Sequence, residues 1–213
     1  MSGKRIAIVT GGSLGDWVLK ELQPDDLLVG SDRGALFLIE NGLRPHISLG
    51  DFDSVTLEDK EKIRASSTLF MDCDPVYKDL TDTEMAFEWA LSQQPGSIVL
   101  LGALGTRFDH SLANIHLLRK AADCGTPCRI IDASNEIRLI RESTVLQKGP
   151  YAHVSLLPVS LEVTGITLRG FQYPLEQATL QIGQSLGISN VLLEETGDIQ
   201  IEAGYLLVIQ SKD

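Results

Sequence analysis

The chain has 213 residues, of which 43% are hydrophobic and 22% are charged, as in an ordinary soluble globular protein. This length allows one large domain or two small ones, each with a core of its own. The formal net charge of −11 argues against nonspecific binding to nucleic acid, because such binding needs clustered Lys and Arg.

The first two-thirds of the chain alternates strand-like and helix-like segments. Strands are predicted at 5–10, 27–31, 47–49, 68–71, 98–101 and 128–132. Helices are predicted between them at 17–22, 35–41, 57–65, 82–92 and 112–123. Continuous apolar strands that alternate with helices indicate a mostly parallel sheet with helices on both faces. We therefore expect a Rossmann-like α/β domain over residues 1–133.

The pattern changes near residue 134. Short alternating or β-branched runs follow at 136–141, 143–146, 153–158, 162–168, 178–182 and 205–210, and Gly, Pro and Asn separate them. Such runs predict an antiparallel β domain, a sandwich or a small barrel, over residues 134–213.

The composition of the chain also bears on its compartment. The amino terminus has no long apolar segment of the signal-peptide kind, and no apolar run approaches the length of a membrane span. Three cysteines fit a reducing compartment, and Cys124 and Cys128 have no second Cys/His pair that would complete a zinc site. We expect a cytoplasmic protein with neither a membrane nor a nucleic acid as partner.

The sharpest motif is Gly-Asp-Phe-Asp-Ser at 50–54. Asp51 and Asp53 emerge after the strand at 47–49, and open α/β sheets bind ligands at the carboxyl ends of their strands. Carboxylates gathered there repel one another unless a cation lies between them, and Mg²⁺ is the natural candidate beside a phosphate. The alternative is a plain tight turn, because Asp and Ser are common turn formers. Two carboxylates within three residues favour metal-assisted chemistry on a phosphate.

A second acidic motif, Lys-Asp-Leu-Thr-Asp, occupies 78–82 and opens the helix predicted at 82–92. One of its two carboxylates, Asp79 or Asp82, could simply cap that helix. The pair has no obvious structural need for both, so one of them is a candidate for function.

A third motif, at 102–110, links a predicted strand to a helix. Its glycines give a ligand access to the backbone, and Arg107 offers a planar donor fork that suits a phosphate. Asp109 or His110 could orient a hydroxyl group. The alternative is that Asp109 caps the helix, Arg107 is solvated and His110 is packed in the interior.

Two turns nearer the amino terminus are weaker candidates. The glycines of Thr10-Gly11-Gly12-Ser13 let backbone N–H groups approach a phosphate, although the segment matches neither GxGxxG nor the P-loop pattern. Asp32 follows the second predicted strand, where a helix cap explains it as well as a ligand role does. Arg33 is either a phosphate clamp or a surface residue.

Taken together and in order, these motifs resemble the thiamine pyrophosphokinase (thiamine diphosphokinase) family of the bacterial kind. The residues that carry the resemblance are Ser-Asp-Arg-Gly-Ala (31–35), Gly-Asp-Phe-Asp-Ser (50–54), Lys-Asp-Leu-Thr-Asp-Thr-Glu (78–84), Gly-Thr-Arg-Phe-Asp-His (105–110), Asn114, Gly-Ile-Ser-Asn (187–190) and Gly-Tyr-Leu-Leu-Val-Ile (204–209). The chain departs from the family at Thr106, where a second Gly is usual, and at Val191, where Glu is common.

The resemblance implies transfer of the terminal diphosphate of ATP to the hydroxyl of thiamine, with Mg²⁺ as cofactor. It implies an ATP-binding catalytic domain at 1–133, a thiamine-binding β-sandwich at 134–213, and a homodimer with active sites at the subunit interface. The implied metal ligands are Asp51, Asp53, Asp79 and Asp82. The implied ATP-binding residues are Gly12, Asp32, Arg33, Arg107, His110 and Asn114. The implied thiamine-binding residues are Lys78, Ser189 and Asn190. The implied catalytic residues are Asp53, Asp82, Arg107 and Asp109.

Two other classes of protein remain as alternatives. One is a metal-dependent nucleotide-sugar transferase, in which an Asp-x-Asp motif holds a diphosphate. The other is a noncatalytic thiamine or nucleotide sensor that keeps the fold. The product formed from ATP, Mg²⁺ and thiamine distinguishes all three.

Overall fold

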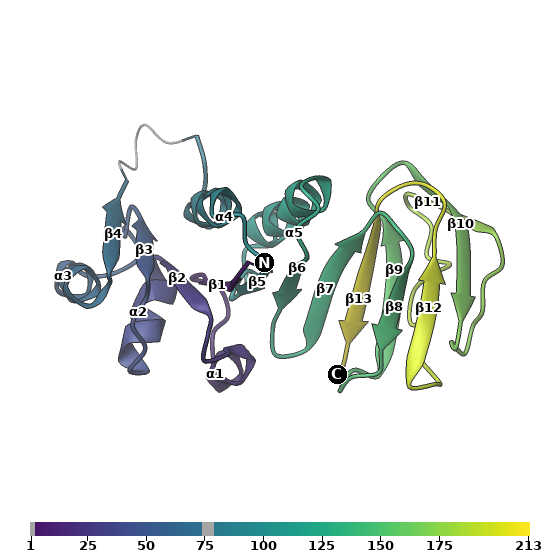
Figure 1. The fold of residues 1–213 in the computed structure, drawn as a ribbon, viewed down its shortest axis with the longest axis horizontal. Helices are drawn as coiled ribbons and strands as arrows, with labels where there is room; N and C mark the ends of the chain where they lie inside the picture. Colours follow the sequence, from purple (N-terminus) through teal and green to yellow (C-terminus); the bar gives the residue numbers. More distant parts are fainter. Residues whose placement is uncertain (1–2, 74–78) are drawn as a thin grey trace. The chain divides into compact units, whose positions relative to one another are not determined.

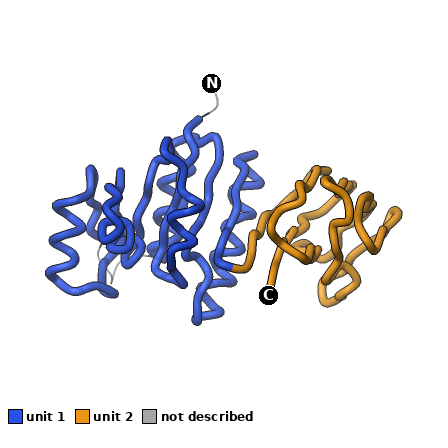
Figure 2. The backbone as a smooth tube through the Cα atoms, turned by 90° about the horizontal axis from the view of Figure 1, so that it is seen from below, with its two compact units in different colours: residues 1–133 blue, residues 134–213 orange. Residues whose placement is uncertain are grey.

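The computed structural model describes residues 3–73 and 79–213 of the chain. The chain divides into a first unit, Met1–Ala133, and a second unit, Ser134–Asp213 (Figure 2). Within the described residues, no helix is long and apolar enough to cross a membrane.

The first unit is built on a parallel sheet with the strand order β4-β3-β2-β1-β5-β6. Its strands are β1 (Arg5–Val9), β2 (Leu27–Ser31), β3 (Ile47–Gly50), β4 (Leu69–Asp72), β5 (Ser97–Leu101) and β6 (Cys128–Ile131). The chain steps outward from β1 to β4 and then returns to the other side of β1 for β5 and β6. The strand order therefore reverses between β1 and β5, which is where open α/β sheets bind their ligands.

Helices cover both faces of this sheet, as Figure 1 shows. They are α1 (Asp16–Glu21), α2 (Arg33–Glu40), α3 (Leu57–Ser66), α4 (Asp82–Ser92) and α5 (Phe108–Asp123). On one face, Val9 of β1 belongs to a buried cluster with Val18 of α1 and Leu38 of α2. Helix α4 packs against the sheet at β1, β2 and β3, and α5 packs at β6. Burial on both faces explains why the strands are continuously apolar.

The two helices that follow the acidic motifs begin differently. Helix α4 begins at the predicted residue, because the hydroxyl of Thr81 accepts a hydrogen bond of 3.1 Å from the backbone N–H of Glu84. Thr81 therefore caps α4, and Asp82 does not have the capping role that its position suggested. Helix α5 begins at Phe108, four residues earlier than predicted, and its N-cap, Arg107, makes no side-chain capping bond. The sequence prediction missed this start because it lacks a capping residue.

The second unit consists of two antiparallel sheets. One contains β7 (Asn135–Ile140), β13 (Leu206–Ser211) and β9 (His153–Pro158), in that order. The other has the order β11-β10-β12-β8, with β11 at Ala178–Gln181, β10 at Glu162–Arg169, β12 at Thr196–Gln200 and β8 at Thr144–Gln147. Side chains from both sheets, including Leu156, Val208, Leu168 and Ile199, form one buried core. The predicted fold class is confirmed.

Strand β12 is the one element of the second unit that the sequence prediction did not contain. Gly197 and Asp198 read as a turn, yet Gly197 lies inside the strand. A side chain at Gly197 would collide with Phe171 and Leu192. Close packing, rather than a turn, explains this glycine.

Candidate active site

A pocket of about 390 Å³ opens at the point where the strand order of the first unit reverses. The loops that leave β1 and β5 form part of its wall, and the loops after β2 and β3 and the amino ends of α4 and α5 complete it. The predicted site residues that line it are Gly12, Asp32, Arg33, Asp53, Asp82, Arg107, His110 and Asn114. Segments that lie far apart in the sequence therefore meet at one site.

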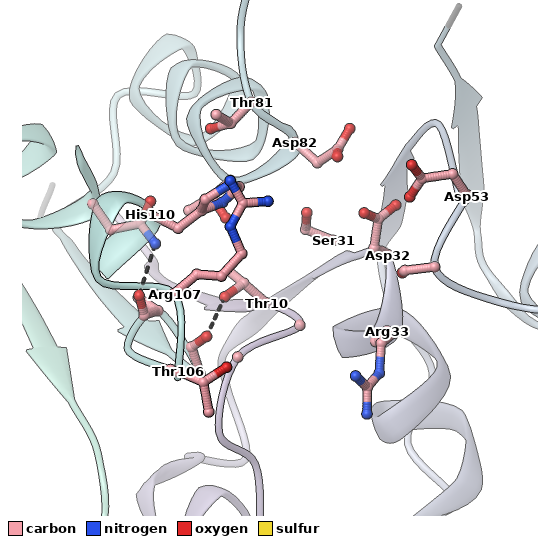
Figure 3. A pocket seen from close by; sticks show the side chains of 18 residues that line it. Thr10, Ser31, Asp32, Arg33, Asp53, Thr81, Asp82, Thr106, Arg107 and His110 are labelled. Carbon is pink, nitrogen blue, oxygen red and sulfur yellow. Dashed lines mark hydrogen bonds between the residues drawn. The ribbon is translucent and has the colours of Figure 1, made fainter. Parts of the chain in front are cut away.

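A group of carboxylates lies on one side of this pocket. Asp32, Asp51 and Asp53 each offer a carboxylate oxygen, and these atoms lie within 4.8 Å of one another. Asp82 joins the group, because its Oδ1 accepts a hydrogen bond of 3.2 Å from the backbone N–H of Asp51. In Figure 3, Asp32, Asp53 and Asp82 lie on one side of the pocket, and Arg107 lies on the other. The family resemblance implies an ATP-binding role for Asp32 rather than membership of this carboxylate group.

The backbone of the Gly-Asp-Phe-Asp segment holds the carboxylates in place. The N–H of Phe52 donates to Oδ1 of Asp32 at 3.0 Å, and the N–H of Asp53 donates to Oδ1 of Asp51 at 3.1 Å. The ring of Phe52 is 3% exposed and stacks on Phe70, with 4.8 Å between ring centroids. Sequence reasoning missed this anchoring role, although a large apolar residue between two aspartates was a signal for it.

Asp32 occupies an unusual backbone position. Its φ of 47° lies in the left-handed region, which costs a residue other than glycine about 1–3 kcal/mol. It is the N-cap of α2 but makes no side-chain capping bond. Its side chain instead lies against Gly50, where a Cβ atom would collide with Oδ1 of Asp32. Of the two alternatives for Asp32, the geometry favours the ligand role over the cap.

The surroundings of Asp32 disfavour a negative charge on its carboxylate. Burial raises its pKa from 3.8 to about 7, with further contributions from the negative charge of Asp82 and from a hydrogen bond with Asp82. The hydrogen bond from Phe52 opposes this shift. A cation bound between these carboxylates would remove the repulsion and favour the ionised form. The donor set, all carboxylate oxygens, is the one that Mg²⁺ prefers.

Arg107 provides a positive charge on the opposite side of the pocket. Its Nη2 lies 2.6 Å from Oδ2 of Asp109, and its Nε donates to Oδ1 at 3.3 Å. Both side chains are exposed, at 69% and 64%, so solvent screens this ion pair and it adds little to stability. The hydrogen bond from Arg107 lowers the pKa of Asp109. Asp109 is therefore a weak proton acceptor that is suited to orienting the guanidinium group.

Gly12 and Asn114 hold the loop after β5. The N–H of Gly12 donates to the carbonyl of Gly102 at 2.9 Å. The amide of Asn114, which is 6% exposed, donates to the carbonyl of Ala103 at 2.7 Å. Arg33 is exposed, and its side chain points away from the carboxylates in Figure 3.

Asp51 and Asp109 contact residues of the pocket wall but do not line the pocket themselves, and the remaining predicted site residues lie elsewhere. Asp79 is exposed in the bend before α4 and does not line the pocket, and Lys78 lies outside the described residues. Ser189 is exposed in the second unit, with its N–H bonded to Oγ of Ser155 at 3.0 Å. The amide of Asn190 is 5% exposed and bonds the backbone N–H and carbonyl of Tyr173 at 3.0 and 2.7 Å. Asn190 thus fixes the backbone at Tyr173.

These features together define a class of protein. A parallel α/β sheet places a pocket at its switch point, and carboxylates face an arginine across that pocket. Such a site suits a metal-assisted transfer of phosphoryl groups from a nucleotide, in which catalysis comes from positioning and electrostatics.

Comparison with known proteins identifies the family. Residues 18–130 match the family model described as "Thiamin pyrophosphokinase, catalytic domain", and residues 133–206 match "Thiamin pyrophosphokinase, vitamin B1 binding domain". The chain is 34% identical to the thiamine pyrophosphokinase of Bacillus subtilis, over 99% of this chain and 100% of that protein. The chain belongs to the thiamine pyrophosphokinase family.

Solved structures agree with this assignment. The crystal structure of thiamine pyrophosphokinase from Bacillus subtilis superposes with a TM-score of 0.91 at 33% identity, covering 99% of this chain and 100% of that one. The enzyme from Geobacillus thermodenitrificans gives a TM-score of 0.88 at 38% identity, over 98% of each chain. The predicted activity, ATP-dependent transfer of a diphosphate to thiamine, is confirmed. The nucleotide-sugar transferase and the noncatalytic sensor have no support from these comparisons.

Proposed function

We propose that the pocket of the first unit is where the enzyme holds the phosphates of ATP, with Mg²⁺ bound by Asp32, Asp51 and Asp53. The observation that carries this proposal is the convergence of the three carboxylate oxygens within 4.8 Å. Two of the three residues, Asp32 and Asp53, line the pocket on the side opposite Arg107. Asp82 supports the group through its bond to the backbone of Asp51. Asp79 remains a prediction as a further ligand.

The magnesium ion would supply charge neutralisation on the phosphate oxygens. The raised pKa of Asp32 supports this assignment, because burial and the charge of Asp82 both disfavour the ionised form and a bound cation would favour it. Asp53 is the most exposed of the three residues that would hold the ion. Lys60, which donates to the carbonyl of Asp51 at 3.3 Å and pairs with Asp72 at 2.8 Å, holds the back of the loop.

Arg107 acts from the other side of the pocket. Its guanidinium uses Nε and Nη2 toward Asp109, which leaves donors on the same planar group for phosphate oxygens. The hydroxyl oxygen of thiamine bonds to the β-phosphorus, the bond to the oxygen of the α-phosphate breaks, and AMP leaves. Arg107 stabilises the negative charge that develops in this step.

The hydroxyl proton of thiamine needs an acceptor. Asp109 is the weaker of the two candidates, because its pKa is lowered and both of its oxygens face Arg107. Asp82 lines the pocket beside the carboxylate group, and we propose it as the acceptor.

Thiamine, the acceptor substrate, needs a binding site of its own. We assign thiamine binding to the second unit, with Ser189 in contact with the substrate and Asn190 holding the neighbouring backbone at Tyr173. Thiamine is a cation, so the acidic protein attracts it. Lys78 remains a prediction as a contact. A homodimer with active sites at the subunit interface, located in the cytoplasm where the three free cysteines stay reduced, completes the proposal.

A product assay tests the function as a whole. Incubation with ATP, Mg²⁺ and thiamine should yield thiamine diphosphate and AMP in equal amounts. Formation of ADP would indicate transfer of a single phosphate and would refute the proposed attack at the β-phosphorus. Replacing Mg²⁺ by EDTA should abolish turnover, and full activity in EDTA would refute the metal assignment. Light scattering at micromolar concentration tests the homodimer.

A further inference from the structure

The loop between β5 and α5 carries Arg107, and buried side chains hold it at several points. The hydroxyl of Thr10, 2% exposed, donates to the carbonyl of Gly102 at 2.5 Å. The amide of Asn114 donates to the carbonyl of Ala103 at 2.7 Å. At the far end of the loop, the hydroxyl of Ser111 bonds Gly105. Of these anchoring side chains, Ser111 lies nearest in sequence to Arg107, and the proposed mechanism gives it no role.

Ser111 bridges the two ends of a three-residue segment. Its side chain is on the first turns of α5 and is 7% exposed. Its Oγ accepts a hydrogen bond of 3.1 Å from the N–H of Gly105 and lies 3.1 Å from the carbonyl of Arg107, to which it donates. One hydroxyl thus ties the residue that opens the Gly105–Arg107 segment to the residue that closes it.

This bridge matters because the pairing with Asp109 orients only the guanidinium group of Arg107 and does not hold the backbone from which that side chain starts. Arg107 is the N-cap of α5 without a side-chain capping bond, and its side chain is 69% exposed. Its side-chain partner, Asp109, is itself 64% exposed and follows it by two residues. The direction in which the side chain leaves the backbone is therefore set by the backbone itself. Both the N–H and the hydroxyl of Ser111 donate to the carbonyl of Arg107, and the hydroxyl alone also reaches the N–H of Gly105.

We propose that Ser111 is a positioning residue for diphosphate transfer, which fixes the backbone of Gly105–Arg107 so that Arg107 faces the phosphates of ATP. The inference rests on the proposed role of Arg107. A displacement of about 1 Å at such a group can cost on the order of 100-fold in rate.

A serine that bonds the carbonyl four residues earlier is also common in helices without any function. The second bond of Ser111, to an N–H outside the helix, separates it from that case. Ser67 offers a matched control. It is 8% exposed, its hydroxyl lies 2.7 Å from the carbonyl of Ile63 four residues earlier, and it bonds Ser48 at 2.7 Å. Ser67 does not line the pocket.

The experiment compares Ser111→Ala, Ser111→Thr and Ser67→Ala. In S111A we expect kcat/KM for ATP to fall about tenfold to 100-fold, because Arg107 is no longer held in one direction. S111T retains the hydroxyl and should stay within about threefold of the wild type. S67A should lose as much thermal stability as S111A while keeping the wild-type kcat/KM. Ser111→Cys, which keeps the volume of the side chain and weakens the bond, serves the same comparison if S111A does not fold.

A double-mutant cycle with Arg107→Ala gives the decisive readout. If Ser111 acts through Arg107, adding S111A to R107A should change kcat/KM by less than about twofold, since coupled residues are not additive. A further fall as large as the one in the wild-type background would overturn the proposal, and so would equal activity of S111A and S67A. Wild-type activity in R107A would instead refute the proposed role of Arg107, and the positioning role with it.

Discussion

Replacing Asp32 by Asn removes a negative charge from the carboxylate group and should stabilise the metal-free protein at high pH. The pKa of Asp32 is raised from 3.8 to about 7. At about 1.4 kcal/mol per pKa unit, a shift of about three units corresponds to at most about 4 kcal/mol. Asp32 is only half-buried, so screening by solvent reduces this to about 1–3 kcal/mol. Asn keeps an oxygen that can accept the bond from Phe52.

The sign of the pH dependence follows from the raised pKa. Between about pH 4 and pH 7 the folded state binds more protons at Asp32 than the unfolded state does, so stability falls as the pH rises through this window. Asn does not titrate, so D32N should lack this fall. The two proteins should then differ little at pH 4 and by the full amount of about 1–3 kcal/mol above pH 7.

Thermal unfolding in EDTA, without ATP, measures the effect at pH 5 and pH 8. The expected gain in Tm of D32N at pH 8 is about 2–12 °C, from about 2–4 °C per kcal/mol at this chain length. Asp25→Asn, at an exposed position, changes the net charge equally and should shift Tm little. Adding Mg²⁺ should stabilise the wild type and reverse the ranking. A lower Tm of D32N at pH 8, or the same pH dependence in both proteins, would refute the reasoning.

Three further substitutions test the site. Asp53→Asn should lower kcat by at least about 100-fold with little change in Tm, because Asp53 is exposed and its role is electrostatic. Steady-state kinetics at saturating Mg²⁺ and a parallel melting curve measure the two quantities. Phe52→Ala should cost about 3–5 kcal/mol of unfolding free energy, since the ring is buried against Phe70, and urea denaturation measures it; a loss below about 1 kcal/mol would contradict the anchoring role. Asp109→Asn should reduce kcat/KM for ATP about tenfold while leaving the acidic limb of the pH–rate profile in place, because Asp109 orients Arg107. Disappearance of that limb would identify Asp109 as the proton acceptor after all.

Local patterns were enough to predict the main features of the fold. The parallel sheet, the antiparallel second unit and the start of α4 at Asp82 all follow from periodicity and from the residues at the ends of elements. The start of α5 and the strand β12 did not follow. The first lacks a capping residue, and the second contains a glycine that is explained by the approach of Phe171 and Leu192.

The carboxylate site was also only partly predictable from the sequence. Asp51 and Asp53 could be placed at the end of β3 from the sequence alone, because a short apolar strand precedes them and their spacing is too small for a second element. The sequence did not show that Asp32 joins Asp51 and Asp53, because a helix cap explained Asp32 equally well. Parallel pairing of β2 with β3 brings its carboxylate to theirs, and Gly50 leaves the space that it occupies.

The amino-acid sequence specifies which carboxylates, glycines and arginine are available and at which strand ends they lie. Folding in three dimensions determines which of them meet. It raised the pKa of Asp32 by burying it beside Asp82, lowered that of Asp109 by pairing it with Arg107, and turned Asn190 inward to the backbone of Tyr173. The physical reason is that charge interactions and hydrogen bonds depend on distance and burial. Neither quantity is set by spacing along the chain.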